Sequence, residues 1–191
     1  MLPNRPLKVG IVGATGAVGI EIIDVLHKTK FLVKELILFA SSKSAGKSQE
    51  TPFGTIVIQE FDLGVARACD LIFLAVTGEF ALENAPKLIA DDGPVVIDNS
   101  SAFRYMDNIP LVVGSTGSFS LLKSFDFYIF IDIQVPEVNA DALTNSKLIA
   151  NPNCTTAIAA VVLWPLHLKY GIKKLIVSSY QAASGAGAEV R

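Results

Sequence analysis

The 191-residue sequence is poor in cysteine and in charge, and each shortage excludes a class of protein. Its two cysteines, Cys69 and Cys154, are too few for a disulfide framework and are typical of a reducing compartment. No apolar run reaches the ~18 residues that a membrane-spanning helix requires. Charged residues make up only 18% of the chain and the formal net charge is −2, so nothing favours nucleic acid or a membrane surface as a partner.

Apolar residues, by contrast, are abundant. They make up 51% of the chain, with a mean hydropathy of +0.47, as expected for a parallel β-sheet covered on both faces. The length fits one domain, or one domain and part of another. Residues 1–6 lead almost directly into a strand, which leaves no room for a targeting peptide in the sequence as written. We therefore expect a cytoplasmic protein, or a plastid protein if a leader precedes Met1, and we expect no metal site.

A glycine-rich turn stands near the start of the chain, in the sequence GATGAVG at 13–19. It follows a β-rich run at 8–12 and precedes a segment whose apolar residues recur at helical spacing. Gly13 suits the tight turn, Gly16 lets the backbone approach a pyrophosphate, and Gly19 permits close packing of helix against strand. The pyrophosphate would lie over the helix N-terminus. This order predicts a dinucleotide-binding βαβ unit, and a purely structural glycine turn is the alternative.

The loop after the next strand indicates which coenzyme is bound. An NAD-specific site usually has an Asp or Glu there for the ribose 2′-hydroxyl, and this loop has none. It carries Ser41 and Ser44 beside Lys43 and Lys47, and hydroxyls beside lysines suit a 2′-phosphate. We therefore expect NADP, with a solvated basic loop as the alternative.

Further apolar runs complete the pattern of a doubly wound sheet. Residues 70–76 form a continuous apolar run of the buried parallel kind. Residues 94–98 are expected to form the next strand, 147–150 a short apolar strand, and 55–59 alternates as an outer strand would. Thr77 follows the first of these strands, at the sheet edge where open α/β sheets bind ligands, so we expect it near the cofactor.

Cys154 lies in the sequence NPNCTT (151–156), between a short strand and an apolar, Ala-rich run at 157–168. A strand-to-helix junction places it at a helix N-terminus, where unpaired N–H groups and the macrodipole favour the thiolate. The same donors, with the Asn153 side chain, could hold an oxyanion on a carbonyl that the sulfur attacks. The alternative is a buried small hydrophobe. The polar neighbours and the dinucleotide signature favour the nucleophile.

Arg104 follows Asn99 and two serines after the strand at 94–98, which makes it a plausible clamp for an oxyanion. The alternative is an ordinary surface charge. Cys69 stands just before a buried strand, and we expect it to be structural.

Six segments in chain order, spanning nearly the whole sequence, resemble the aspartate-semialdehyde dehydrogenases. The segments are GATGAVG (13–19), SAGK (44–47), DNSSAFR (98–104), PEVN (136–139), NPNCTT (151–156) and SYQAASGAG (179–187).

The resemblance implies a fold and an activity. The fold is a Rossmann-like doubly wound parallel sheet over 1–153, followed over 154–191 by the first helix and strand of an α+β catalytic and dimerisation domain. The activity is the NADP-dependent reduction of β-aspartyl phosphate to aspartate semialdehyde and phosphate through a cysteine thioester. This step lies on the route to lysine, threonine and methionine, and the full-length form is expected to be a homodimer.

The resemblance also implies roles for individual residues. Cys154 matches the nucleophile with Asn153 beside it, Gln181 matches the glutamine that orients the substrate, and Arg104 matches the arginine that binds its phosphate. Together with the residues singled out above, the expected cofactor contacts are Gly13, Thr15, Gly16, Ala17, Val18, Ser41, Lys43, Ser44, Thr77, Ser184 and Gly185.

The sequence departs from the family pattern at two places. Residues 113–135 separate segments that the family joins directly, and their Phe, Ile and Ser bias predicts an insertion that we interpret as a translated intron. A genuine insertion with an extra strand at 125–133 is the alternative. The chain also stops before the family's histidine acid/base and its substrate-binding arginine, so we expect poor turnover from this chain alone. Its two histidines, His27 and His167, lie outside the family's histidine motif.

Two other functions remain open at this point. An N-acetyl-γ-glutamyl-phosphate reductase shares the general plan, although its cysteine motif differs. A non-catalytic dinucleotide-binding fragment would bind NADP without turnover.

Overall fold

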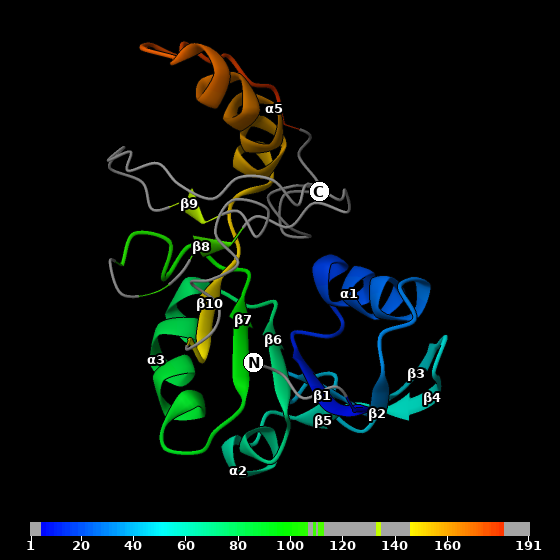
Figure 1. Ribbon diagram of the computed structural model, residues 1–191. Helices are drawn as coiled ribbons and strands as arrows, with labels where there is room; N and C mark the ends of the chain where they lie inside the picture. The colour runs from blue at the N-terminus through cyan, green and yellow to red at the C-terminus, as the bar shows by residue number, and fades with distance from the viewer. Residues whose placement is uncertain (1–4, 107–108, 110, 113–132, 135–145, 182–191) are drawn as a thin grey trace.

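An eight-stranded sheet forms the centre of the molecule (Figure 1). The computed structural model describes residues 5–106, 109, 111–112, 133–134 and 146–181. Within them the strand order is β5-β2-β1-β6-β7-β10-β8-β9, and every pairing is parallel. The strands are β1 (Leu7–Val12), β2 (Val33–Ala40), β5 (Gln59–Glu60), β6 (Leu71–Leu74), β7 (Val95–Asp98), β8 (Leu111–Val112), β9 (Ile133–Gln134) and β10 (Leu148–Ala150).

Helices cover both faces of this sheet, which confirms the expected doubly wound fold. The crossover from β1 to β2 and the crossover from β6 to β7 run in opposite directions across the sheet. Because such connections are right-handed, their helices lie on opposite faces. Figure 1 shows α1 on one face and α2 and α3 on the other, with α5 rising beyond the end of β10. The described helices are α1 (Ala17–Lys28), α2 (Leu63–Arg67), α3 (Gly78–Ile89) and α5 (Cys154–Tyr170).

The core is divided between the two faces. Under α2 and α3 lie the inward side chains of the central strands, among them Phe39, Ile72, Leu74 and Val96, which are fully buried together with Leu88 of α3. On the other face, Ile23 of α1 packs in one cluster with Val9, Ile11, Leu38 and Leu71 of the strands. Consecutive residues of β1, β2 and β6 therefore serve opposite faces, and this explains why these strands have continuous apolar sequences.

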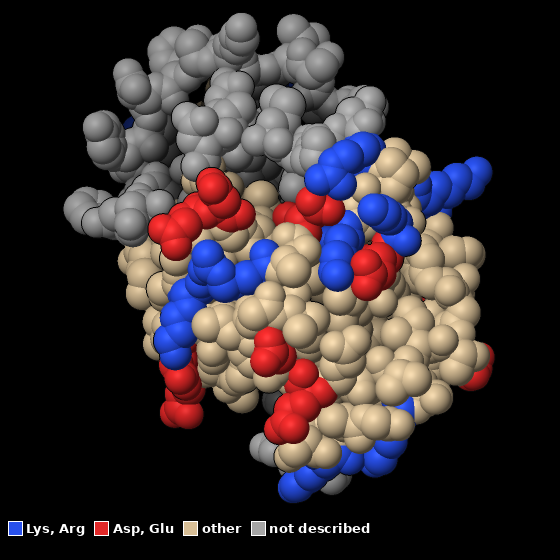
Figure 2. Space-filling model, turned by 90° about the horizontal axis from the view of Figure 1, so that it is seen from below, with Lys and Arg blue, Asp and Glu red and all other residues tan. Residues whose placement is uncertain are grey.

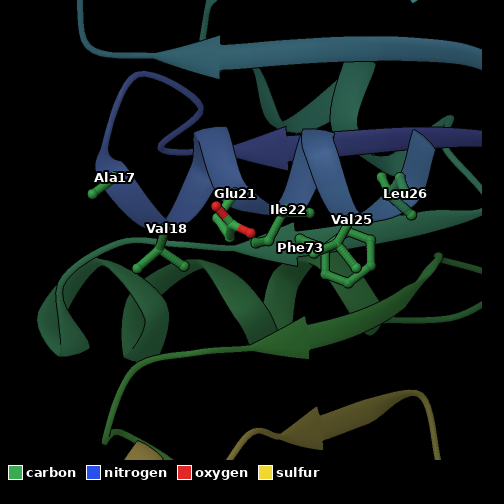
Figure 3. Close-up of a pocket in the computed structure, with 7 residues that line it drawn as sticks. All are labelled: Ala17, Val18, Glu21, Ile22, Val25, Leu26 and Phe73. Carbon is green, nitrogen blue, oxygen red and sulfur yellow. The ribbon is translucent and has the colours of Figure 1, made fainter. Parts of the chain in front are cut away.

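The surface along α1 contains an apolar hollow. A hollow of about 400 Å³ runs along α1, with Val18, Ile22 and Val25 on the helix and Phe73 on β6 (Figure 3). Glu21 is the single charged residue in its lining. The hollow suits apolar contacts and is poorly suited to a phosphate-bearing ligand.

The prediction of one outer strand at 55–59 is wrong in detail, because the segment is divided at Ile58 between two strands. Its first part belongs to β4 (Gly54–Val57), which pairs antiparallel with β3 (Ser48–Thr51) in a separate hairpin, while β5 pairs with β2. Ile58 between them is buried and bonds through its backbone to Gly46 and Lys47. An alternating pattern fits a hairpin and a sheet edge equally well, so the pattern alone did not reveal the break.

Residues 171–181 follow α5 and contain neither helix nor strand. The strand expected within 154–191 is therefore not found in 171–181, while 182–191 lie outside the described residues. A strand needs a neighbour for its backbone hydrogen bonds, and no described strand pairs with this segment. Of the predicted insertion, 113–132 and Val135 lie outside the described residues, while Ile133 and Gln134 form β9 beside β8.

Charges of both signs are interspersed on the face opposite α5, with broad uncharged areas between them (Figure 2). This distribution agrees with the small net charge of the sequence. None of the described helices is both long and apolar enough to cross a membrane.

Candidate active site

The residues predicted to be functional gather at one edge of the sheet. Parallel strands all end on the same side, so the loops that follow β1, β2, β6, β7 and β10 share that edge (Figure 1). These loops carry the glycine turn, the Ser/Lys loop, Thr77, Arg104 and Cys154 in that order.

The glycine turn is shaped by close backbone contacts. Gly13 has φ +87°, and a Cβ placed on it would lie 2.1 Å from the carbonyl oxygen of Ala75. A Cβ on Gly19 would lie 2.3 Å from the carbonyl oxygen of Gly13, so the helix can approach the turn this closely only with glycine there. Both positions agree with the roles expected from the sequence.

The N-terminus of α1 has the properties of an anion site. Residues 15–18 are exposed, and Gly16 at the N-cap provides no side-chain hydrogen bond. The first turn contains no acidic residue. Each of the other described helices has a side-chain cap, from Asp62, Thr77 or Asn153. The N–H groups of α1 are thus left for a ligand, and a pyrophosphate fits them.

The Ser/Lys loop lies beside the glycine turn. The carbonyl oxygen of Phe39, near the end of β2, accepts hydrogen bonds from Gly13 N and Ala14 N, at 2.9 and 3.1 Å. Lys43 and Lys47 are exposed, and neither forms an ion pair with another described residue. The loop therefore presents unpaired positive charge at the place where a 2′-phosphate would lie.

Thr77 occupies a structural position at this edge. Its Oγ1 accepts a hydrogen bond from Phe80 N at 3.4 Å and so caps α3. Its predicted contact with the cofactor stays a prediction.

Arg104 is held by two backbone carbonyls. Its Nε donates to Asn151 O at 2.9 Å and its Nη2 donates to Asn99 O at 3.0 Å. Its Nη1 forms no hydrogen bond with any described residue. The guanidinium is half-buried, and its charge partly offsets the rise that burial causes in the pKa of the Asp98 carboxyl. Neither of its two hydrogen bonds is to a carboxylate, so the guanidinium can also face an anion.

A buried carboxylate stands at the base of the Arg104 loop. Asp98 is fully buried and accepts hydrogen bonds from Ser100 N at 3.1 Å and from Ser100 Oγ at 2.7 Å. Burial raises the pKa of the Asp98 carboxyl, and the two bonds from Ser100 oppose that rise. The loop that leads to Arg104 is therefore anchored in the core.

Cys154 is the first residue of α5, and it is exposed. The Asn153 Oδ1 atom caps the helix by accepting from Thr155 N at 2.9 Å, and it lies 3.9 Å from the Cys154 sulfur. The structure thus places this thiol at a helix N-terminus with its neighbouring amide in contact, as the sequence predicts. Asn153 uses its side-chain oxygen as the cap, so its Nδ2 is the atom left for an oxyanion.

Cys69 differs from Cys154 in its burial and in its surroundings. It is buried, its Sγ lies 3.8 Å from Val65 O, and burial raises the pKa of its thiol to about 11. A buried neutral thiol is inert as a nucleophile, which agrees with the structural role expected for it.

The remaining predicted site residues stay predictions, and His27, which was not expected to be functional, has a packing role. Gln181 is exposed and forms no hydrogen bond within the described part of the chain. Ser184 and Gly185 lie outside the described residues. His27 packs edge to face on Phe53, with ring centroids 5.7 Å apart, which is a packing contact.

Sequence reasoning missed the supporting residues Asp98, Asn99 and Asn151. A signal was present, since each follows or ends a buried strand and two of them carry amides. Their pairing joins residues about fifty positions apart, however, and nothing in a single sequence indicates that contact.

Comparison with known proteins gives the family. The model of the semialdehyde dehydrogenase NAD-binding domain matches residues 8–146. The chain belongs to this family. It is 40% identical over 184 residues to an aspartate-semialdehyde dehydrogenase of Synechocystis, a match that covers 96% of the chain and 48% of the relative. The chain thus spans about half the length of the curated relatives it matches.

Solved structures of similar proteins agree. A Vibrio cholerae aspartate semialdehyde dehydrogenase II, solved in complex with ASA, is 36% identical with a TM-score of 0.78, over 98% of this chain and 50% of that one. A Candida albicans aspartate semialdehyde dehydrogenase, solved with NADP, is 25% identical with a TM-score of 0.61, over 88% and 48% of the two chains. The semialdehyde dehydrogenase fold of this chain is therefore shown by sequence and by structure alike.

Proposed function

We propose that this chain is the cofactor-binding and nucleophile-bearing part of an NADP-dependent aspartate-semialdehyde dehydrogenase. Residues 1–153 form its dinucleotide-binding domain, and 154–191 begin its catalytic and dimerisation domain. The full-length form acts as a homodimer on β-aspartyl phosphate, in the synthesis of lysine, threonine and methionine.

One observation carries this proposal: an exposed cysteine at a capped helix N-terminus shares a sheet edge with an uncapped, glycine-lined helix N-terminus. The first suits a nucleophile and the second suits a pyrophosphate. The named relatives support the substrate, and the Candida albicans structure supports the coenzyme.

The chemistry follows from the residues at this edge. The Cys154 thiolate attacks the acyl carbon of β-aspartyl phosphate, the acyl–phosphate bond breaks, and phosphate leaves with its charge held by Arg104. Asn153 Nδ2 and the N–H groups of α5 stabilise the oxyanion formed in this attack. When bound at the glycine turn, NADPH would supply the hydride that reduces the thioester carbon. The carbon–sulfur bond then breaks, which releases aspartate semialdehyde and regenerates the Cys154 thiolate. Gln181 is the residue we expect to orient the substrate.

The Ser/Lys loop supplies the preference for NADP over NAD. Lys43 and the hydroxyls of Ser41 and Ser44 bind the 2′-phosphate, while the turn at 13–18 binds the pyrophosphate in both coenzymes.

A coenzyme titration tests this assignment on the chain itself. In Lys43→Ala, we expect NADP to bind about tenfold more weakly, because one charge-assisted hydrogen bond is lost, while NAD binding stays the same. Calorimetry measures both affinities. Lys28→Ala, at the far end of α1, is the matched control and should change neither. Equal weakening of NADP and NAD by Lys43→Ala would contradict the assignment.

A second measurement tests the nucleophile. Incubation with an acyl phosphate should add one acyl group at Cys154 and none at Cys69, as seen by mass spectrometry of the intact chain and its peptides. Coenzyme binding without acylation would instead support a non-catalytic dinucleotide-binding fragment.

A further inference from the structure

We infer that Asn99 and Asn151 are positioning residues whose paired side-chain amides hold Arg104, the phosphate ligand, in register with Cys154. This inference rests on the function proposed above. We do not place either amide in contact with the substrate. Both act through Arg104 and Cys154, which contact the substrate in the proposed function.

The loop that carries Asn99 is held by hydrogen bonds to the buried Asp98 and to Ser100. Asp98 precedes it, is fully buried, and accepts two hydrogen bonds from Ser100. The Ser100 Oγ atom in turn accepts from Ala102 N at 3.1 Å. The backbone on both sides of Asn99 is thus tied to the core, so the direction of its side chain is set by the fold.

The Asn99 side chain reaches across to the loop after β10. Its Oδ1 accepts a hydrogen bond from Asn151 Nδ2 at 2.6 Å, between residues 52 positions apart in sequence. Asn151 N also donates to Asp98 O at 2.7 Å, so the backbones lie side by side where β7 and β10 end. The amide pair continues the strand pairing by one further contact, beyond the last bond of the sheet.

Arg104 depends on these same two residues. Its Nε and Nη2 donate to the backbone oxygens of Asn151 and Asn99, one from each loop. If the amide pair opened, the backbone bond from Asn151 N to Asp98 O would be the remaining tie between the two loops at this point, and the two acceptors could move apart enough to weaken the bonds of the guanidinium. The position of Nη1, which bonds to no described residue, is therefore set by the distance between the two loops.

Asn151 is connected to the nucleophile by a short and rigid segment. Pro152 is buried and has a fixed φ, and Asn153 caps α5. Cys154 follows at once. A shift of Asn151 thus moves the sulfur and the anchor of Arg104 together, whereas loss of the amide pair lets the two loops move independently.

Two isosteric substitutions separate this role from a general effect of charge. Asn99→Asp keeps the acceptor that faces Asn151 Nδ2. Asn151→Asp replaces the donor by an oxygen that faces Asn99 Oδ1. Each adds one negative charge near Arg104, so each is the control for the other. Arg104→Gln defines the behaviour expected when the phosphate ligand is absent.

The readout is the rate at which iodoacetamide alkylates Cys154, measured over a range of inorganic phosphate concentrations. We expect phosphate to slow alkylation of the parent chain and of Asn99→Asp. In Asn151→Asp, the phosphate concentration for half protection should rise about tenfold or more, since one hydrogen bond of the network is lost and two acceptors are opposed. Urea unfolding of each variant shows whether the fold is intact. If Asn151→Asp does not fold, Asn151→Ser, which cannot reach Asn99, gives the same comparison.

Each outcome decides a separate point. No phosphate protection in the parent chain would overturn the phosphate site of the proposed function, and this inference with it. Protection in the parent, with the two Asp variants equally affected or Asn99→Asp the more affected, would overturn the inference alone. Changed urea midpoints with an unchanged phosphate response would show that the amide pair only ties the loops together.

Discussion

Two helices begin at the same sheet edge, and they are built in opposite ways. In α1, Gly19, Ile23 and Leu26 are buried against the sheet, and the N-terminus has no side-chain cap. In α5, Asn153 caps the N-terminus, and not one residue is buried among the described parts of the chain. Packing holds α1 and leaves its N–H groups for a ligand. Local bonds hold α5, whose apolar residues on all sides are typical of a helix that other protein covers.

The comparison predicts that the same substitution, isoleucine to alanine, has a large effect on stability in α1 and a small one in α5. Ile23→Ala should lower the free energy of unfolding by about 2–5 kcal/mol, because it leaves a cavity at a fully packed position. Ile158→Ala, at a residue that is 74% exposed, should change it by less than about 0.5 kcal/mol. Urea unfolding followed by circular dichroism measures both. A loss at Ile158 as large as that at Ile23 would show that α5 is packed within this chain.

The buried carboxyl of Asp98 predicts that the stability of the packed sheet depends on pH. Burial raises the pKa of its carboxyl above the ordinary value, so the native state binds the proton more tightly than the unfolded chain does. The resulting stability is complete below the unfolded pKa and is lost as pH rises through the folded pKa. The parent chain should therefore lose stability relative to Asp98→Asn as pH rises through the raised pKa of Asp98. Asp92→Asn, at an exposed position, is the control and should run parallel to the parent. A difference between parent and Asp98→Asn that does not vary with pH would contradict this account.

The smallest expected effect concerns the cap of α5. Asn153→Ala removes the acceptor for Thr155 N and should cost about 1 kcal/mol of helix stability, while Asn153→Asp keeps that acceptor. Because no residue of α5 is fully buried among the described residues, the loss should appear as faster amide exchange in its first turn and not as a lower urea midpoint. Equal exchange in both variants would mean that the cap does not hold the helix.

Most of the sheet was predictable, because continuous apolar runs and glycine turns determine parallel strands and their crossovers locally. The strands at 8–12, 70–76, 94–98 and 147–150, and the helix after Cys154, are confirmed within a few residues. The hairpin of β3 and β4 was not, since Ser48–Thr51 is polar and its pairing is fixed by the turn at Gly54, where φ is +104°. The short helix α2 was missed for the same kind of reason, as its five residues have too few turns to show a period.

The candidate site divides in the same way. Gly13, Cys154 and Arg104 could be found because each stands at a strand end within a recognisable local pattern. The bonds that orient Arg104 could not, because they depend on backbone oxygens of Asn99 and Asn151. Every residue has a backbone carbonyl, so the sequence does not show which carbonyls accept these bonds. The distance between the two loops that carry them depends on how the whole sheet is assembled.

The contrast between the two cysteines has a practical consequence at the bench. One thiol is open to solvent and the other is enclosed, so air oxidation during purification should link two molecules through Cys154 alone. Such a crosslinked pair would run at twice the monomer mass on a non-reducing gel and could be mistaken for a native assembly. Sizing experiments on this protein therefore need fresh reductant, or a serine at position 154.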